Sequence, residues 1–179
     1  MADFDKNCDQ LNALFPLYER DRVSGLQLTI TSEAYYVEPY DLEDFKDHAS
    51  IDFATDDNLL SLYLKAARID VEQYLQRSLG VRTINLLALH LPKNYRLPFG
   101  PVATITTSGF TLFGDILKEG GKDLNLEYIT ADTLVNDSIV QAIYKQAYNY
   151  YENRDSNEPV QLQSIVKAIL APYRAITLI

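Results

Sequence analysis

The sequence is short of cysteine and of long apolar runs, and each shortage argues against a class of protein. Cys8 is the single cysteine, so no disulfide can form within the chain, which favours a reducing compartment. No apolar run approaches the ~20 residues that a membrane-spanning helix needs. The N-terminal stretch "MADFDKNCDQ" is acidic and lacks the charged-then-apolar pattern of a signal peptide. We therefore expect a protein made in the cytoplasm, with no membrane partner.

Basic residues are also few. The chain has 16 Lys and Arg against 25 Asp and Glu, a net charge of −9. A general nucleic-acid-binding protein needs basic patches that neutralise phosphates, and this composition argues against that class. A negatively charged wall repels DNA, so a DNA molecule can pass beside it without being bound.

Residues suited to catalysis are scarce. His48 and His90 are the only histidines, and "FGDILKEGGKD" lacks the spacing of a phosphate-binding loop. His48 could join Asp44 or Asp47 at a metal, but two-ligand surface patches of this kind are usually solvated. A hydrolase using paired carboxylates is the remaining enzyme reading, and no nucleophile–base or metal constellation supports it. We therefore predict that the chain is not an enzyme and has no catalytic, metal or cofactor site.

The order of the predicted elements indicates an α+β fold. It comprises a helical bundle, with one long helix plus shorter N- and C-terminal helices, and a small central antiparallel β region. Alternating apolar and polar residues predict strands within 26–30, 83–91, 102–113 and 124–130. The stretch "GDILKEGGKD" reads as a loop or hairpin tip between the last two.

Three shorter helices are predicted from their capping residues. Asp41 is a good N-cap for a helix that ends by Ser50. A second helix begins at Asp137 or Ser138 and runs through about Asn153. Pro159 fits the first position of the final helix, which ends at 171–172.

The longest predicted helix lies between 55–57 and Gly80, about 24 residues or roughly 36 Å. It carries two offset apolar stripes, whereas a helix on the surface of a monomer needs only one. The second stripe indicates either a central core helix or a helix that also packs against another subunit. The first stripe comprises Leu60, Leu64, Ala67, Val71 and Tyr74, and the second, a predicted subunit interface, comprises Leu59, Leu62, Ala66 and Ile69.

The chain ends in an apolar tail, "YRAITLI", beyond the final helix. Ordering these seven residues costs about 7–14 kcal/mol of backbone entropy. Burying the four large apolar side chains returns about 6–12 kcal/mol. Because the two nearly cancel, we expect the tail to order where a partner adds backbone hydrogen bonds, for example by strand addition.

Several motifs, taken in order, resemble the tailed-phage head–tail connector (adaptor) family. The stretch "EPYDLEDFKDHASID" and the following "DDNLLSLYLKAARIDVEQYLQRSL" resemble the opening of the family. The corner "RLPFGPVATIT" and the endings "YENRD" and "LAPYR" resemble its later motifs. The matching positions are Glu38, Pro39, Leu42, Lys46, His48, Ala66, Ala67, Val71, Glu72, Tyr74, Leu97, Pro98, Pro101, Val102, Ile105, 151–155 and 170–174.

The resemblance spans about 26–174 and implies a structural protein of the virion neck, at the head–tail interface. Such proteins form a homo-oligomeric ring, commonly of twelve copies, under the portal protein. The ring extends the DNA channel, lets DNA pass without specific binding, and offers a platform for the stopper or tail-completion protein. On this reading the chain comprises an N-terminal arm (1–24), a connector domain (25–172) and a C-terminal docking tail (173–179), and is made in the host cytoplasm.

Two further groups of residues have expected roles, the tail from the resemblance and an acidic segment from its charge. Family members use the C-terminal helix and tail to grip the portal. Acidic residues crowd 38–57, where they form either a solubilising face with helix caps or a surface facing DNA or a basic partner. The expected portal-docking residues are Tyr173, Arg174, Ile176, Leu178 and Ile179, and the possible channel lining is Asp41, Glu43, Asp44 and Asp47.

A free-standing bacterial protein-interaction module is the alternative function. It shares the apolar tail but needs no ring. Imaging of the purified protein with its portal distinguishes the two.

Overall fold

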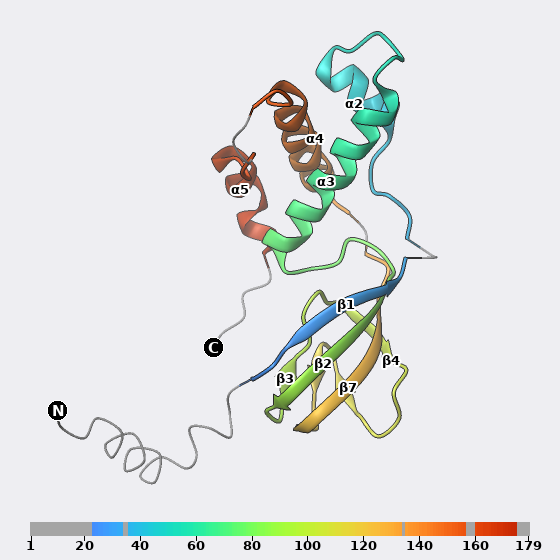
Figure 1. The fold of residues 1–179 in the computed structure, drawn as a ribbon, viewed down its shortest axis with the longest axis vertical. Coiled ribbons are helices and arrows are strands. Elements are labelled where there is room, and N and C mark those ends of the chain that lie inside the picture. Colours follow the sequence, from blue (N-terminus) through green and yellow to red (C-terminus); the bar gives the residue numbers. More distant parts are fainter. Residues whose placement is uncertain (1–22, 34–35, 134, 157–159, 175–179) are drawn as a thin grey trace, which may run out of the picture. The chain divides into compact units, whose positions relative to one another are not determined.

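The computed structural model describes residues 23–33, 36–133, 135–156 and 160–174. The chain divides into two compact units, which we call the β unit (described residues within 1–32, 83–97 and 102–129) and the helical unit (within 33–82, 98–101 and 130–179). The described residues contain four α-helices and two antiparallel sheets (Figure 1). The predicted α+β class is confirmed.

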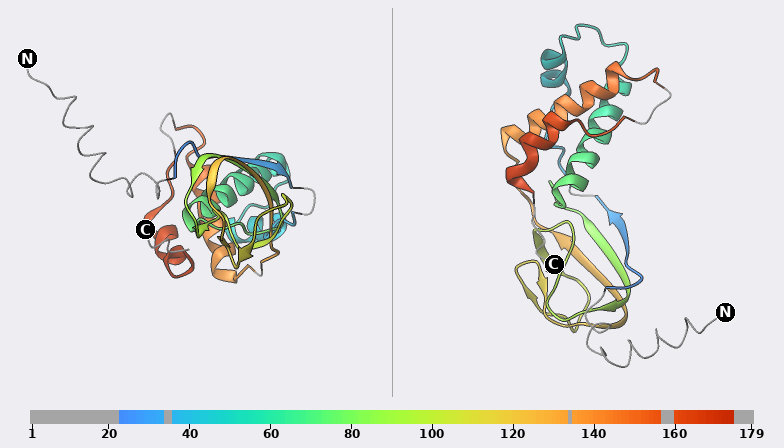
Figure 2. Two further views of the ribbon diagram at one scale, coloured as in Figure 1. Left: turned by 90° about the horizontal axis from the view of Figure 1, so that it is seen from below. Right: turned by 90° about the vertical axis from the view of Figure 1, so that its left-hand side faces the viewer.

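The helical unit contains α2 (Leu42–Ala49), α3 (Asp57–Leu75), α4 (Asp137–Glu152) and α5 (Ser164–Leu170). A short 3₁₀ turn, η1 (Ala171–Tyr173), follows α5 directly. Helix α3 packs along α4, and α4 packs against α5 (Figure 2). All four helices contribute to one apolar core, whose largest members include Phe45, Leu60, Leu64, Leu75, Ile143 and Leu170.

Helix α3 ends at Leu75, five residues before the predicted stop at Gly80. Gln76 adopts a left-handed conformation (φ 53°) and donates its backbone N–H to the carbonyl of Glu72. Beyond it, Ser78 donates its N–H to the carbonyls of Phe99 and Gly100, and Leu79 donates to the Glu72 carboxylate. These alternative partners for the backbone terminate the helix early.

Two other helix starts differ from their predictions. Asn136, not Asp137 or Ser138, caps α4 by accepting the Ser138 N–H at 2.9 Å. Helix α5 begins at Ser164, five residues after the predicted start at Pro159, which lies outside the described residues. The buried side chain of Gln146 binds the backbone of 161 and 163, and this competes with helix formation there.

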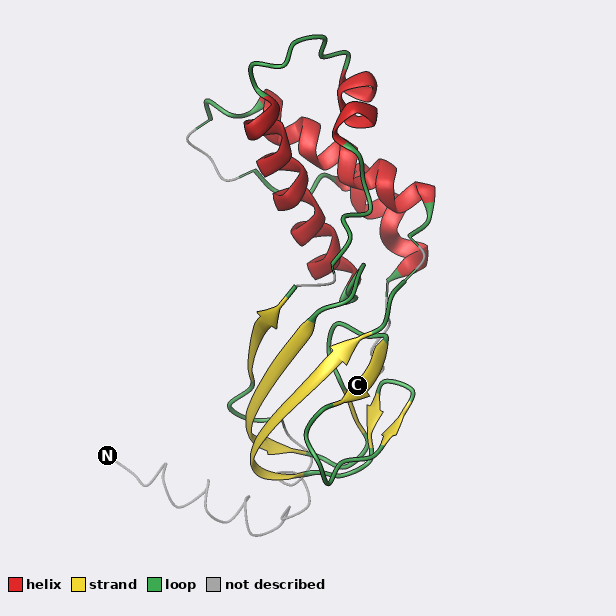
Figure 3. Cartoon of the chain, turned by 90° about the vertical axis from the view of Figure 1, so that its right-hand side faces the viewer, coloured by secondary structure: helices red, strands yellow, loops and turns green. Residues whose placement is uncertain are grey.

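The β unit contains both sheets (Figure 3). Strands β1 (Gln27–Ser32), β2 (Thr83–Leu91), β7 (Gly121–Thr130) and β4 (Val102–Ile105) form the larger sheet in that order. Strands β3 (Tyr95–Arg96), β6 (Ile116–Leu117) and β5 (Leu112–Phe113) form the smaller sheet. Alternate residues of β2 and β7 are buried, including Ile84, Leu86, Leu126 and Tyr128, as period-two patterning requires.

The four predicted strand regions are each occupied by a strand, and the loop "GDILKEGGKD" contributes β6 and the start of β7. The finer prediction, one helical bundle with a small β region, is not confirmed, because the strands form a compact unit of their own. The predicted β region was too small because two-residue strands carry no periodic signal in the sequence. The division of the chain into an arm, a connector domain and a docking tail, with boundaries after 24 and 172, stays a prediction. No helix among the described ranges is long and apolar enough to cross a membrane.

Candidate functional site

The outward side of α3 is the most apolar exposed helix surface of the helical unit. Leu62 is 65% exposed, and Leu59 and Ile69 are 36% and 39% exposed. Each residue of an α-helix is rotated about 100° from the last, which places these side chains roughly opposite the buried Leu64 and Val71. Ala66 lies between them and is half-buried. We call Leu59, Leu62, Ala66 and Ile69 the α3 stripe.

The first predicted stripe of this helix is the buried one. Leu60, Leu64, Ala67 and Val71 are fully buried, and Tyr74 is half-buried against the same core. Helix α3 therefore packs into its own unit with one stripe, and the described residues leave the second stripe partly exposed. An uncovered apolar stripe carries no catalytic chemistry, and it is the kind of surface that marks a protein–protein contact.

The four predicted channel-lining residues are exposed on or beside α2. Asp41 caps the helix by accepting the Glu43 N–H at 2.8 Å. The one basic residue in this acidic stretch, Lys46, is buried, and its ammonium group lies 3.1 Å from Asp57 and 3.6 Å from Glu43. Because the cation is withdrawn into these pairs, the solvent-facing side of α2 presents mainly carboxylates.

A hollow of about 650 Å³ adjoins this acidic face. His48, the predicted candidate for a two-ligand metal patch, lines it, and its ring packs 5.7 Å from that of Tyr144. Within the described ranges no group of three or more His, Cys, Asp and Glu side chains could hold a metal. The other lining residues are Glu38, Pro39, Tyr40, Asp41, Asp44, Asp137, Val140, Gln141 and Tyr144.

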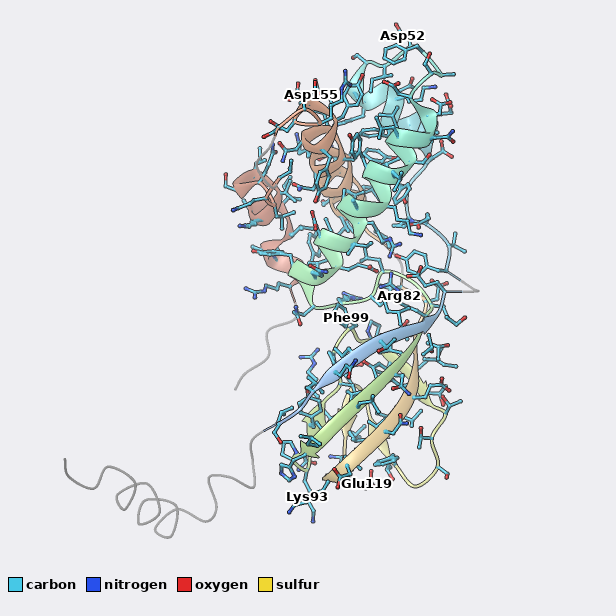
Figure 4. The ribbon with its side chains drawn as sticks, viewed as in Figure 1. Asp52, Arg82, Lys93, Phe99, Glu119 and Asp155 are labelled. Atoms are coloured by element: carbon cyan, nitrogen blue, oxygen red, sulfur yellow. The ribbon has the colours of Figure 1, made fainter. Side chains whose placement is uncertain are left out.

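A buried charge cluster, which sequence reasoning missed, centres on Glu72. Its carboxylate accepts hydrogen bonds from Arg68 at 3.1 Å, Arg82 at 2.7 Å (labelled in Figure 4), the Tyr36 hydroxyl at 3.1 Å and the Leu79 N–H at 2.8 Å. Arg68, Glu72 and Arg82 are almost completely buried. The sequence signal was the i, i+4 spacing of Arg68 and Glu72 beside the buried stripe of α3.

The cluster holds Tyr36, which precedes α2, against α3. The Tyr36 ring lies between the guanidinium groups of Arg68 and Arg82, 4.5 and 4.6 Å from its centre. Burial, with the negative charge of Glu72, raises the pKa of the Tyr36 phenol well above its ordinary value. Two carboxylates complete the cluster, Glu38 beside Arg68 at 3.2 Å and Glu33 beside Arg82 at 3.3 Å.

The described part of the predicted docking tail lies beside α3. Tyr173 is half-buried against the helical core, and the Arg174 guanidinium lies 5.2 Å from the centre of the Tyr74 ring. Ile176, Leu178 and Ile179 lie outside the described residues, as do Cys8 and the rest of 1–22 in the predicted arm (1–24).

A family model described as "Phage gp6-like head-tail connector protein" matches residues 39–174. The chain belongs to this family. The membership confirms the resemblance seen in the sequence and makes the chain a structural protein of the head–tail junction of a virion. It favours this function over a free-standing interaction module.

Solved particle structures contain chains of similar fold. A chain in the neck of an empty GTA particle computed with C6 symmetry gives a TM-score of 0.64 at 21% identity. Chains in the virion of the native gene transfer agent (GTA) particle and in the neck of the native particle computed with C12 symmetry each give 0.61, at 20% and 23% identity. Each likeness covers 86% of this chain and 97% of the other, and at these identities it establishes the fold. The comparison with curated proteins gave no match.

Proposed function

We propose that this connector assembles as a dodecameric ring under the portal protein of a phage neck. The single observation that carries the proposal is the uncovered α3 stripe on a chain of this family. Full burial of one Leu or Ile side chain is worth about 1.5–3 kcal/mol, so covering the stripe with a neighbouring copy contributes appreciably to association.

A ring also agrees with the contact that the α3 stripe can make and with the symmetry of the similar particle necks. The stripe can pack against a different surface of the next copy, which makes a head-to-tail contact. Head-to-tail contacts close into rings when the rotation permits. The similar chains come from particle necks computed with C6 and C12 symmetry, which supports a copy number of twelve.

The C-terminal tail is proposed to grip the portal. Arg174 is exposed at the point where the described chain ends, and Tyr173 keeps part of its ring accessible. Ile176, Leu178 and Ile179 follow in a β-prone stretch that suits addition to a sheet of the portal. A weak grip repeated around a ring gains strength through multivalency.

The acidic residues of α2 are proposed to line the DNA channel. Asp41, Glu43, Asp44 and Asp47 present negative charge to solvent, and negative charge repels the DNA backbone. The ring would thus extend the channel without retaining DNA and would present its far side to the stopper or tail-completion protein. No reaction is assigned to the chain.

Negative-stain electron microscopy of the chain mixed with its portal protein tests the ring. Wild type should give rings on the portal, whereas Leu62→Asp should not, because a carboxylate would be buried in the subunit contact. Ser61→Asp, an exposed position on the same helix outside the stripe, is the matched control and should assemble normally. Rings of Leu62→Asp indistinguishable from wild type would contradict the assignment of the stripe.

A further inference from the structure

Strand β1 is an edge strand without the usual protection. The described segment from Val23 to Ser32 has no charged residue and no proline, and β1 pairs only with β2 in the larger sheet. Val23, Leu26 and Ile30 are 37–49% exposed. Proteins usually protect such edges with charges, prolines or bulges, because a free edge is a template for another strand. The irregularity of β1 lies near its end, between Ile30 and Ser32.

The hydrogen-bonding pattern shows which groups of β1 are available. Both backbone groups of Glu127 in β7 bond on the β4 side, since its carbonyl accepts the Thr106 N–H at 2.9 Å and its N–H donates to the Thr107 hydroxyl at 2.9 Å. Bonded and non-bonded pairs alternate along an antiparallel ladder, so Glu127 and its β2 partner Asn85 form a non-bonded pair, and Asn85 bonds instead to its β1 partner Thr29. The N–H and C=O groups of Leu28 and Ile30 therefore point to the outer edge, where no described strand pairs with them.

Strand β4 is the opposite edge of the same sheet and is also uncharged. Val102 donates its N–H, on the side away from β7, to the Asp115 carboxylate at 2.8 Å. Alternation places the backbone groups of Thr104 on that same outer edge, and the Thr104 side chain is exposed. Asp115 thus occupies one position of this edge and leaves the next one available.

We infer that β1 of one copy pairs with β4 of a second copy, so that the larger sheets join head to tail around the assembly. The inference rests on the proposed ring. A head-to-tail contact needs two different surfaces on each copy, and the sheet has two different edges with which no described strand pairs. Pairing β1 with β1 would use one edge twice and stop at a dimer.

The chemistry of the two edges favours a second copy as the occupant. Neither strand has a charged residue, and the Asp115 carboxylate beside β4 is paired with Arg96 at 3.5 Å. The two edges can therefore approach with little repulsion despite the net charge of −9. Both offer threonines, and cross-strand threonine pairs are favourable. Ile30 is 49% exposed although its partner Ile84 is buried, and an added strand would cover it.

Cross-linking tests the pairing in the full chain with Cys8→Ser as background. Thr29→Cys and Thr104→Cys, combined in one chain, should give a ladder of covalent multimers when a short thiol cross-linker is added to rings on the portal. Either cysteine alone should remain monomeric. Dimers of the Thr29→Cys variant alone would show that β1 pairs with β1. Cross-linking of that variant to the portal protein would show that an extended portal segment pairs with β1. Each of these results would overturn the inference.

A substitution at the edge provides the second measurement. Ile30→Lys should weaken ring assembly at least tenfold, because a charge on the edge blocks strand addition. Leu89→Lys, at an exposed position of the central strand β2, is the matched control, and circular dichroism checks that both variants fold. Rings that form normally with Ile30→Lys and give no cross-linked ladder would overturn this inference and leave the proposed ring intact. Absence of rings for the wild-type chain on its portal would instead contradict the proposed function and this inference with it.

Discussion

Different interactions stabilise the interior of the helical unit and the interior of the β unit. The charges of the β unit balance, with Lys93, Arg96, Lys118 and Lys122 against Asp115, Glu119, Asp123 and Glu127, whereas acidic residues outnumber basic ones in the described helical unit. The buried charged residues among the described ones, Lys46, Arg68, Glu72 and Arg82, all belong to the helical unit. The β unit relies on apolar packing and backbone ladders, while the helical unit depends also on paired charges. The two should therefore respond differently to the same perturbations.

Removing the Glu72 carboxylate should cause the largest loss of stability, and this loss should be confined to the helical unit. Glu72→Ala leaves Arg68 and Arg82 buried without their shared partner, and breaking a buried pair in this way costs about 3–5 kcal/mol. Hydrogen exchange resolved by segment should show faster exchange in α3 and α4 and unchanged exchange in β2 and β7. Glu152→Ala, at an exposed position, is the control. Equal loss of protection in both units would contradict the separation.

Truncating the apolar core of the β unit should produce the converse result. Leu86 is fully buried and is paired with Leu28 and Leu126 on its neighbouring strands. Leu86→Ala should cost about 2–5 kcal/mol, measured as lost protection in β2 and β7. Leu89→Ala, exposed on the same strand, should change stability by less than about 0.5 kcal/mol. A comparable effect of both variants would show that the inward face of β2 is misassigned.

Removing a helix cap should have a smaller effect, again confined to the helical unit. Asp41→Ala deletes the side chain that accepts the Glu43 N–H, and loss of such a cap costs about 1 kcal/mol. Urea unfolding followed by circular dichroism measures the change. Glu43→Ala, which leaves the cap intact, should have less effect, and a reversed order of the two variants would contradict the assignment of the cap.

High pH should weaken the helical unit gradually. Burial, followed by the hydrogen bond to Asp70, raises the pKa of Tyr150 to about 12. Because the phenol is held neutral in the folded state, its contribution is fully present below the ordinary pKa of about 10 and is lost as the pH rises through the folded value. Tyr150→Phe should therefore flatten the decline in stability between about pH 10 and 12, seen in unfolding curves collected across that range. A decline identical to that of wild type would contradict this assignment.

Much of the helical unit was predictable because its signals are local. The cap at Asp41 and the two stripes of α3 follow from residue spacing within one helix. The end of α3 was not predictable, because Ser78 finds its partners at 99–100, far along the chain. The Glu72 cluster was missed for the same reason, since Tyr36 and Arg82 reach it from outside the helix.

The main strands of the β unit could be predicted from the sequence, but the size of the unit could not. The nine residues of β2 were located correctly because they alternate and end before Pro92. The smaller sheet was missed because its strands have two residues each, and such pairs form only through partners distant in sequence. The edges of the larger sheet could not be recognised until the strand order was known.

A side-chain-resolution reconstruction of the neck in the assembled particle tests the central claim most directly. The account predicts that Leu59, Leu62, Ala66 and Ile69 of each copy lie within about 4.5 Å of apolar atoms of the next copy around the ring, the distance that defines packing contact. A neck in which the outward side of α3 faces solvent, with the copies joined through other surfaces, would contradict it.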